Sequence, residues 1–149
     1  MTLRRRENMT GIPTGTVLLL CLVGALSGAT WSKAATETPF DFTGHWTGVA
    51  QETGETDTTL TADLSTGAHP RLFVGTLVGE TNPDPPVACE VKGKLKGLTK
   101  VKMRLSCSNG TIKAHGLLDA GVPSITGTFA RRGRHRIHHG TFALTEQVV

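Results

Sequence analysis

Apolar and polar residues alternate one by one along residues 89–107, with a single interruption near the middle. The odd positions outside that interruption hold Cys89, Val91, Gly93, Leu95, Val101, Met103, Leu105 and Cys107, and the even positions are polar or basic. Alternation with a period of two is typical of β-strands, because successive side chains point to opposite faces. The interruption at residues 97–99 indicates a turn. The pattern predicts a β-hairpin centred on Leu98, in which residues equally distant from Leu98 lie opposite each other.

Strand-like segments continue through the chain from residue 43 onward. We expect eight of them, at residues 43–53, 57–64, 70–79, 87–96, 100–107, 111–119, 122–131 and 134–145. Turn residues separate them, among them Asn109-Gly110, the favoured pair of a two-residue hairpin. Because such short connections require antiparallel neighbours, the sequence predicts an all-β fold, an eight-stranded antiparallel up-and-down β-barrel. A β-sandwich stays open as the alternative, since regular spacing alone does not distinguish the two folds.

The first 34 residues have the pattern of a secretory signal peptide. Arg4, Arg5 and Arg6 precede an apolar stretch at residues 17–29, which is short for a membrane span, and small residues follow it. We expect cleavage after Ala34, an N-terminal lead at residues 35–42 and one barrel domain at residues 43–149. An uncleaved anchor is the alternative. The mature protein is then secreted or periplasmic, without a membrane span.

Two cysteines, Cys89 and Cys107, are left once residues 1–34 are removed. An even pair of cysteines in an exported domain predicts a disulfide. The hairpin pattern supports this prediction independently, because both residues are equally distant from Leu98 and share the apolar face of the hairpin.

The formal net charge of +4 is divided unevenly along the chain. Residues 35–90 carry nine acidic side chains and one basic side chain, whereas residues 91–149 carry eleven basic and two acidic ones. Six of the basic residues share the polar face of the predicted hairpin: Lys92, Lys94, Lys96, Lys100, Lys102 and Arg104. One interpretation is an anion-binding patch for a lipid or polysaccharide of the cell envelope. The alternative is a solvated face that resists aggregation.

The segment Phe42-Thr43-Gly44-His45-Trp46 resembles the opening of lipocalins and other calycin-type barrels. The Gly-x-Trp motif and the order of eight strands carry this resemblance. It implies that Trp46 closes one end of the barrel and packs against a basic residue of the last strands, for which the candidates are Arg131, Arg134 and Arg136. Phe42, Trp46 and Arg136 are therefore the expected barrel-closing or ligand-contacting residues. The chain departs from lipocalins in having no tyrosine.

The sequence contains no arrangement that is typical of an enzyme or a metal centre. His135, His138 and His139 form a cluster, but four arginines nearby would repel a cation, so no metal or other cofactor is expected. No serine stands in a Gly-x-Ser-x-Gly elbow, and the disulfide accounts for both remaining cysteines.

These observations favour an exported, non-enzymatic β-barrel protein that binds a small apolar ligand or a partner at the barrel mouth. One alternative is an envelope-surface interaction module that binds anionic lipid or polysaccharide through the basic hairpin. Another is a periplasmic enzyme or protease inhibitor. No specific nucleic-acid partner is expected.

Overall fold

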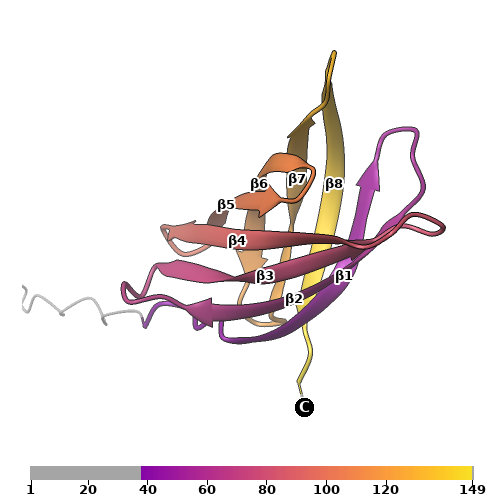
Figure 1. Ribbon diagram of the computed structural model, residues 1–149. Helices are drawn as coiled ribbons and strands as arrows, with labels where there is room; N and C mark the ends of the chain where they lie inside the picture. Colours follow the sequence, from indigo (N-terminus) through magenta and orange to yellow (C-terminus); the bar gives the residue numbers. More distant parts are fainter. Residues whose placement is uncertain (1–37, 149) are drawn as a thin grey trace, which may run out of the picture. The chain divides into compact units, whose positions relative to one another are not determined.

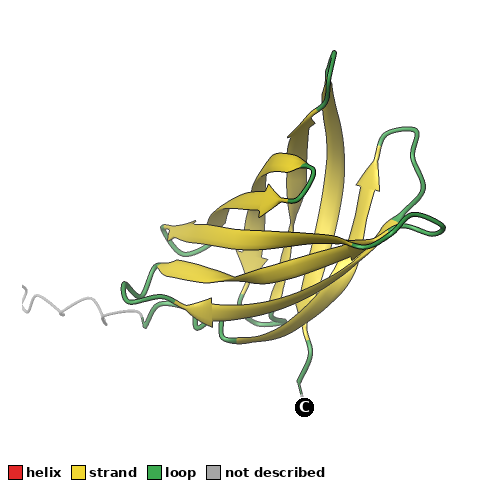
Figure 2. Cartoon of the chain, in the orientation of Figure 1, coloured by secondary structure: helices red, strands yellow, loops and turns green. Residues whose placement is uncertain are grey.

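Eight β-strands make up the described part of the chain (Figures 1 and 2). The computed structural model describes residues 38–148, so the predicted signal peptide lies outside the described residues. The strands are β1 (Gly44–Glu52), β2 (Thr58–Thr66), β3 (Leu72–Glu80), β4 (Val87–Lys96), β5 (Lys100–Cys107), β6 (Gly110–Asp119), β7 (Ser124–Arg132) and β8 (Ile137–Glu146). Within the described residues, no helix has the length and apolar character needed to cross a membrane.

The sheet closes on itself. Each strand pairs antiparallel with the next, and β8 pairs with β1. This closure confirms the up-and-down barrel and excludes the sandwich. Because strand direction alternates, the connections β1–β2, β3–β4, β5–β6 and β7–β8 share one end of the barrel, which we call the mouth. The other three connections lie at the opposite end, which we call the closed end.

The hairpin of β4 and β5 has the register that the sequence predicts. Cys89 lies opposite Cys107, and a disulfide joins them. Lys92 lies opposite Arg104. Buried and exposed residues alternate strictly from Cys89 to the end of β4, with the apolar side chains inside the barrel. Period-two alternation therefore determines both the register and the buried face here.

A continuous apolar core fills the barrel interior toward the closed end. Its largest fully buried side chains are Phe42, Trp46, Phe73, Ile125, Leu144, Val91 and Val101. Phe42 lies in the segment just before β1, so this segment contributes to the core in addition to the strands.

Several strand glycines are required by this packing, and Gly93 and Gly48 show the reason. A Cβ atom at Gly93 would lie 2.0 Å from the ring of Phe73, so the ring occupies the space that a side chain on β4 would need. A Cβ atom at Gly48 would lie 1.7 Å from the carbonyl oxygen of Ala143, so β1 and β8 approach closely at this point. Glycines inside strands commonly mark such close approaches in small barrels.

Five strands begin one to three residues later than the sequence suggests, and backbone hydrogen bonds give the reason for β3 and β8. The N–H of Gly133 donates to the carbonyl oxygen of Arg136 (2.9 Å), which closes a turn before β8. The N–H of Leu72 donates to the carbonyl oxygen of His69 (2.8 Å), which does the same before β3. The predicted starts at residues 134 and 70 are therefore wrong, because these local turns use the backbone groups first.

Candidate ligand-binding cavity

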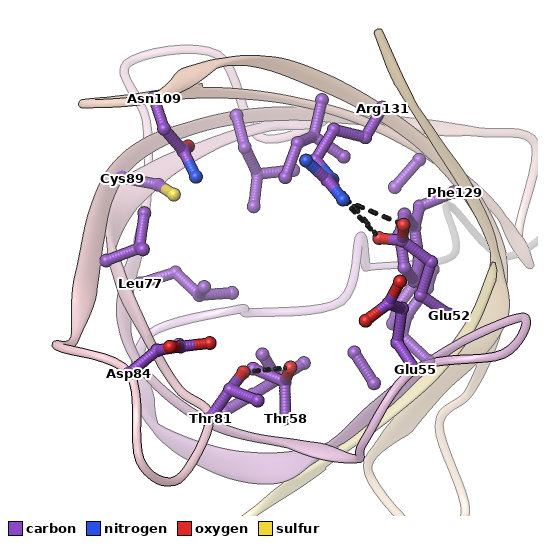
Figure 3. A pocket seen from close by; sticks show the side chains of 18 of the residues that line it. Glu52, Glu55, Thr58, Leu77, Thr81, Asp84, Cys89, Asn109, Phe129 and Arg131 are labelled. Carbon is purple, nitrogen blue, oxygen red and sulfur yellow. Dashed lines mark hydrogen bonds and ion pairs between the residues drawn. The ribbon is translucent and has the colours of Figure 1, made fainter. Parts of the chain in front are cut away.

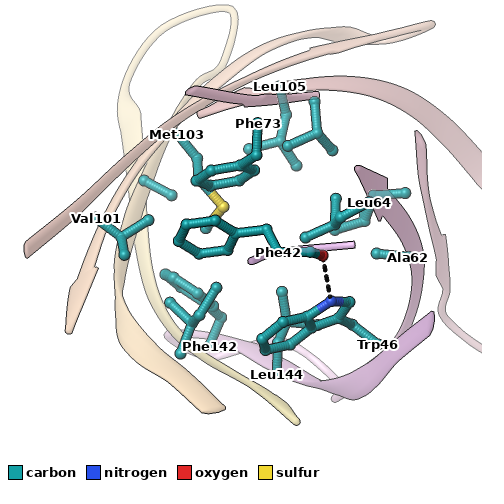
Figure 4. Close-up of a cluster of buried hydrophobic side chains, with 14 of the residues drawn as sticks. Phe42, Trp46, Ala62, Leu64, Phe73, Val101, Met103, Leu105, Phe142 and Leu144 are labelled. Atoms are coloured by element: carbon teal, nitrogen blue, oxygen red, sulfur yellow. Dashed lines mark hydrogen bonds between the residues drawn. The ribbon is translucent and has the colours of Figure 1, made fainter. Parts of the chain in front are cut away.

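Three aromatic side chains plug the closed end of the barrel (Figure 4). Phe42, Trp46 and Phe73 have no exposed surface. The rings of Phe42 and Phe73 stack with centroids 4.1 Å apart. The indole N–H of Trp46 donates to the carbonyl oxygen of Phe42 (3.1 Å), which satisfies the one polar group that this buried ring carries. Phe42 and Trp46 thus lie together, buried at the closed end of the barrel.

Hydrogen bonds attach residues 41–43, the segment that carries Phe42, to β2. The N–H of Phe42 donates to the hydroxyl oxygen of Thr66 (3.0 Å), and that hydroxyl donates to a carboxylate oxygen of Asp41 (2.7 Å). The N–H of Thr43 also donates to Asp41 (2.9 Å). These bonds from Thr66, and next those from Thr43, hold the pKa of Asp41 below its usual value of 3.8, because they favour the ionised carboxylate.

The mouth end of the interior is open and contains a cavity of about 360 Å³ (Figure 3). Its walls are mostly apolar side chains that point inward from many strands, among them Ala50, Leu60, Leu77, Val87, Ile112 and Phe129. Phe142 and Leu144 also line it, so the cavity ends on the same core that the aromatic plug belongs to. The barrel is therefore packed at one end and hollow at the other.

An ion cluster lies in the cavity wall near the mouth. The carboxylate of Glu52 on β1 accepts hydrogen bonds from the guanidinium of Arg131 on β7, with the shortest N–O distance at 2.7 Å (Figure 3). The Nδ1 atom of His138 on β8 lies 2.6 Å from the same carboxylate. Only 12% of the Glu52 side-chain surface is exposed, so this charge depends on its two partners.

Glu52 was not among the cavity residues expected from the sequence. Glu52 has the same parity along β1 as Trp46, Gly48 and Ala50, so the alternation itself places it inside the barrel. That signal was present in the sequence. Its partner Arg131, however, lies 79 residues away along the chain.

Other polar groups surround the mouth. The hydroxyls of Thr58 and Thr81 lie 2.6 Å apart, and Glu55, Asp84 and Asn109 also line the cavity (Figure 3). Within residues 38–148, neither Glu55 nor Asp84 forms an ion pair. The cavity therefore combines an apolar interior with a polar opening that offers hydrogen-bonding groups.

Arg136 does not pack against Trp46, which corrects the expectation drawn from the calycin resemblance. Arg136 is exposed in the β7–β8 turn at the mouth, whereas Trp46 lies opposite Glu146 at the closed end. The reason is topological, because β8 runs antiparallel to β1 and therefore begins at the mouth. Arg131, the second candidate, points into the cavity and pairs with Glu52. Arg134 is exposed in the same turn as Arg136.

The six basic residues of the β4–β5 hairpin are all exposed on the outer surface of the barrel. We call Lys92, Lys94, Lys96, Lys100, Lys102 and Arg104 the basic hairpin face. Strand β6 extends it, because Lys113 lies opposite Arg104 and His115 opposite Lys102. Among the described residues, no carboxylate forms an ion pair with any of the six.

The three histidines of the predicted cluster point to different places. His135 is exposed in the β7–β8 turn, His138 reaches Glu52 inside the barrel, and His139 is exposed on the outer surface. The described part of the chain holds no group of three or more His, Cys, Asp or Glu side chains arranged to bind a metal ion.

Comparisons with known proteins place the fold. No family model matches the chain, and no curated protein matches it in sequence. Among solved structures, it is similar to a de novo designed fluorescence-activating β-barrel, with a TM-score of 0.56 and 13% identity over 75% of this chain and 99% of that one. It is also similar to a redesigned β-barrel, with a TM-score of 0.57 and 14% identity over 71% of this chain and 91% of that one. At these identities the likeness shows the fold, a small closed β-barrel.

Proposed function

We propose that this protein is an exported, non-enzymatic barrel that binds a small, largely apolar molecule in the cavity at its mouth. The observation that carries the proposal is the asymmetry of the interior. Aromatic rings fill the closed end, whereas about 360 Å³ of mostly apolar space is left at the other end. Concave, mainly apolar pockets with a few polar groups are typical sites for small molecules.

The cavity limits the size and polarity of its ligand. Its volume lies at the small end of the usual range for ligand sites, about 300–1,000 Å³. A compact ring system or a short acyl chain fits such a space. Its apolar part would contact Leu60, Leu77 and Ile112, and a polar end would lie near the hydroxyls of Thr58 and Thr81 at the mouth.

Two further observations support other parts of the proposal. The disulfide between Cys89 and Cys107 is consistent with an oxidising compartment and hence with export. The position of Trp46 at the closed end supports a calycin-like relationship, since it matches the barrel-closing part of the role that the Gly-x-Trp motif implies.

Binding is tested with an apolar fluorescent probe, N-phenyl-1-naphthylamine, titrated into the purified protein. Ala114 is buried on β6 and lines the cavity, so Ala114→Phe fills the space where the probe would lie. Ala88 is exposed on the outer surface of β4, so Ala88→Phe adds the same side chain outside the barrel. We expect a fluorescence increase for the wild type and for Ala88→Phe, and at least a tenfold weaker affinity for Ala114→Phe.

Equal affinity in the two variants would place the probe outside the cavity and overturn the proposal. Circular dichroism and thermal melting establish that both variants are folded, because an added ring inside a barrel costs about 1–3 kcal/mol where space is short. Native mass spectrometry of gently purified protein then gives the mass of any molecule that accompanies the chain.

A further inference from the structure

The arrangement of cations on the basic hairpin face has an electrostatic cost. The register places Lys92 opposite Arg104, Lys94 opposite Lys102 and Lys96 opposite Lys100. Like charges directly opposite on neighbouring strands destabilise a sheet. The described residues supply no carboxylate that forms an ion pair with these six cations. An external anionic surface would supply the missing complement.

Exposed apolar side chains border the lysines on three sides. Leu72 on β3 lies opposite Lys94 and is 40% exposed. Leu117 on β6 lies opposite Lys100 and is 58% exposed. Leu98, 55% exposed, stands in the turn that joins β4 to β5. Cationic and apolar groups therefore share one continuous region of the outer surface.

This mixed chemistry distinguishes between anionic partners. A soluble polyanion offers charge but no apolar phase for the three leucines. An anionic bilayer offers both, because its headgroups attract lysines while apolar side chains enter the boundary with the acyl chains. Lysine suits this position, since its long apolar stem lies along the boundary while its ammonium group stays at the headgroups.

We propose that the basic hairpin face docks the protein onto an anionic lipid bilayer, with Leu72, Leu98 and Leu117 entering the interface. This proposal does not depend on the cavity. Binding weakens steeply as salt rises, because exposed charges are screened over about 10 Å at 0.1 M ionic strength. The zwitterionic surface of phosphatidylcholine alone gives little binding.

The first test compares vesicles of phosphatidylcholine with and without phosphatidylglycerol in a sedimentation assay with the mature, exported protein. Each lysine near an anionic surface strengthens binding about fivefold, so Lys94→Gln with Lys102→Gln weakens it roughly 25-fold. The matched control, Arg134→Gln with Arg136→Gln, removes the same charge from the exposed β7–β8 turn, which lies beside Arg104 at the mouth and at the opposite end of the barrel from Leu98. We expect the control to bind within about threefold of the wild type. Equal losses in the two variants would show a general charge effect and overturn a localised docking face.

Folding does not confound this comparison. Lys94 and Lys102 repel each other across the hairpin, so replacing them with glutamine leaves the protein at least as stable. Thermal melting of both variants checks this expectation. A gain of stability that accompanies the loss of vesicle binding would agree with the view that the cations are present for a partner.

The second test asks whether the turn enters the bilayer. Leu98→Trp places a reporter in the β4–β5 turn, and Ile137→Trp places one at a similarly exposed site at the mouth. The fluorescence of each variant is measured against that of the unsubstituted protein. With phosphatidylglycerol vesicles, we expect a shift of the emission to shorter wavelength for Leu98→Trp only. The absence of a shift for Leu98→Trp, or equal shifts for the two variants, would overturn the proposal.

Competing partners give different results. Dextran sulfate that binds as tightly as the vesicles, with the same dependence on Lys94 and Lys102, would assign the face to a soluble polyanion. A salt-sensitive dimer in sedimentation velocity without lipid would assign it to a second copy of the chain. Either result would overturn the bilayer proposal.

Discussion

At the residue scale, Glu52 adds a charged group to a mostly apolar cavity. It points inward at the last position of β1, and its partners Arg131 and His138 come from β7 and β8. Packed side chains hold the closed end together, whereas charged hydrogen bonds connect these three strands near the hollow mouth. The same cluster places a polar surface beside the apolar wall.

Replacing Glu52 with glutamine therefore destabilises the barrel. The change leaves Arg131 and His138 without their carboxylate partner, and we expect the free energy of unfolding to fall by about 1–2 kcal/mol, since the pair is partly exposed. Glu80 is exposed at the end of β3, and Glu80→Gln is the matched control, with an expected change below about 0.5 kcal/mol. Urea unfolding measures both. Equal effects would contradict a structural role for the cluster.

Asp41 makes the plug sensitive to acid. Hydrogen bonds from Thr66, and then from Thr43, lower the pKa of Asp41 in the folded protein below 3.8. The stabilisation is thus fully present at pH values well above 3.8 and is lost as the pH falls through the lower folded value. We expect Asp41→Asn to be less stable than the wild type at neutral pH, with a difference that shrinks in acid. Thermal melting across pH measures this, and a constant difference would contradict it.

At the scale of elements, the pairing of β3 with β4 shows how one strand makes room for another. Phe73 and Gly93 lie opposite each other, and the ring of Phe73 covers the glycine. This contact is invisible to a pattern of alternating polarity, which treats Gly93 only as a gap in the apolar series. The position of Phe73 in the aromatic plug depends on this contact with Gly93.

Gly93→Ala is expected to destabilise the barrel by about 1–3 kcal/mol, because the new methyl group overlaps the Phe73 ring. A second substitution tests the cause. Phe73→Leu shortens the overlapping side chain, so adding Phe73→Leu to Gly93→Ala should cost less than the sum of the two single changes. Denaturant unfolding of the four proteins gives the coupling energy. Strict additivity would show that the loss arises elsewhere.

Local patterns predicted the hairpin of β4 and β5 well, because its register depends on alternation around Leu98 within one short segment. The disulfide between Cys89 and Cys107 follows from the same local geometry. Its basic face could also be identified from the sequence. The sequence does not show whether other strands neutralise that face, because this depends on which residues of β3 and β6 lie beside it.

At the scale of the whole molecule, closure was the feature that the sequence left undecided. Closure depends on the pairing of β1 with β8, whose residues lie near opposite ends of the described chain. The same long-range pairing determines the site. It places Arg136 at the mouth, away from Trp46, and it brings His138 and Arg131 to Glu52. Local spacing contains no information about these contacts, so the hollow mouth and its ion cluster required the folded barrel.

One end of this barrel is hollow, and we propose that it accepts an apolar molecule. Methyl NMR of the protein titrated with N-phenyl-1-naphthylamine tests it most directly. Leu77 and Ile112 line the cavity, whereas Leu72 and Leu117 are exposed outside the barrel. We predict saturable shifts of the Leu77 and Ile112 methyl signals, with those of Leu72 and Leu117 unchanged. Shifts confined to Leu72 and Leu117 would contradict it.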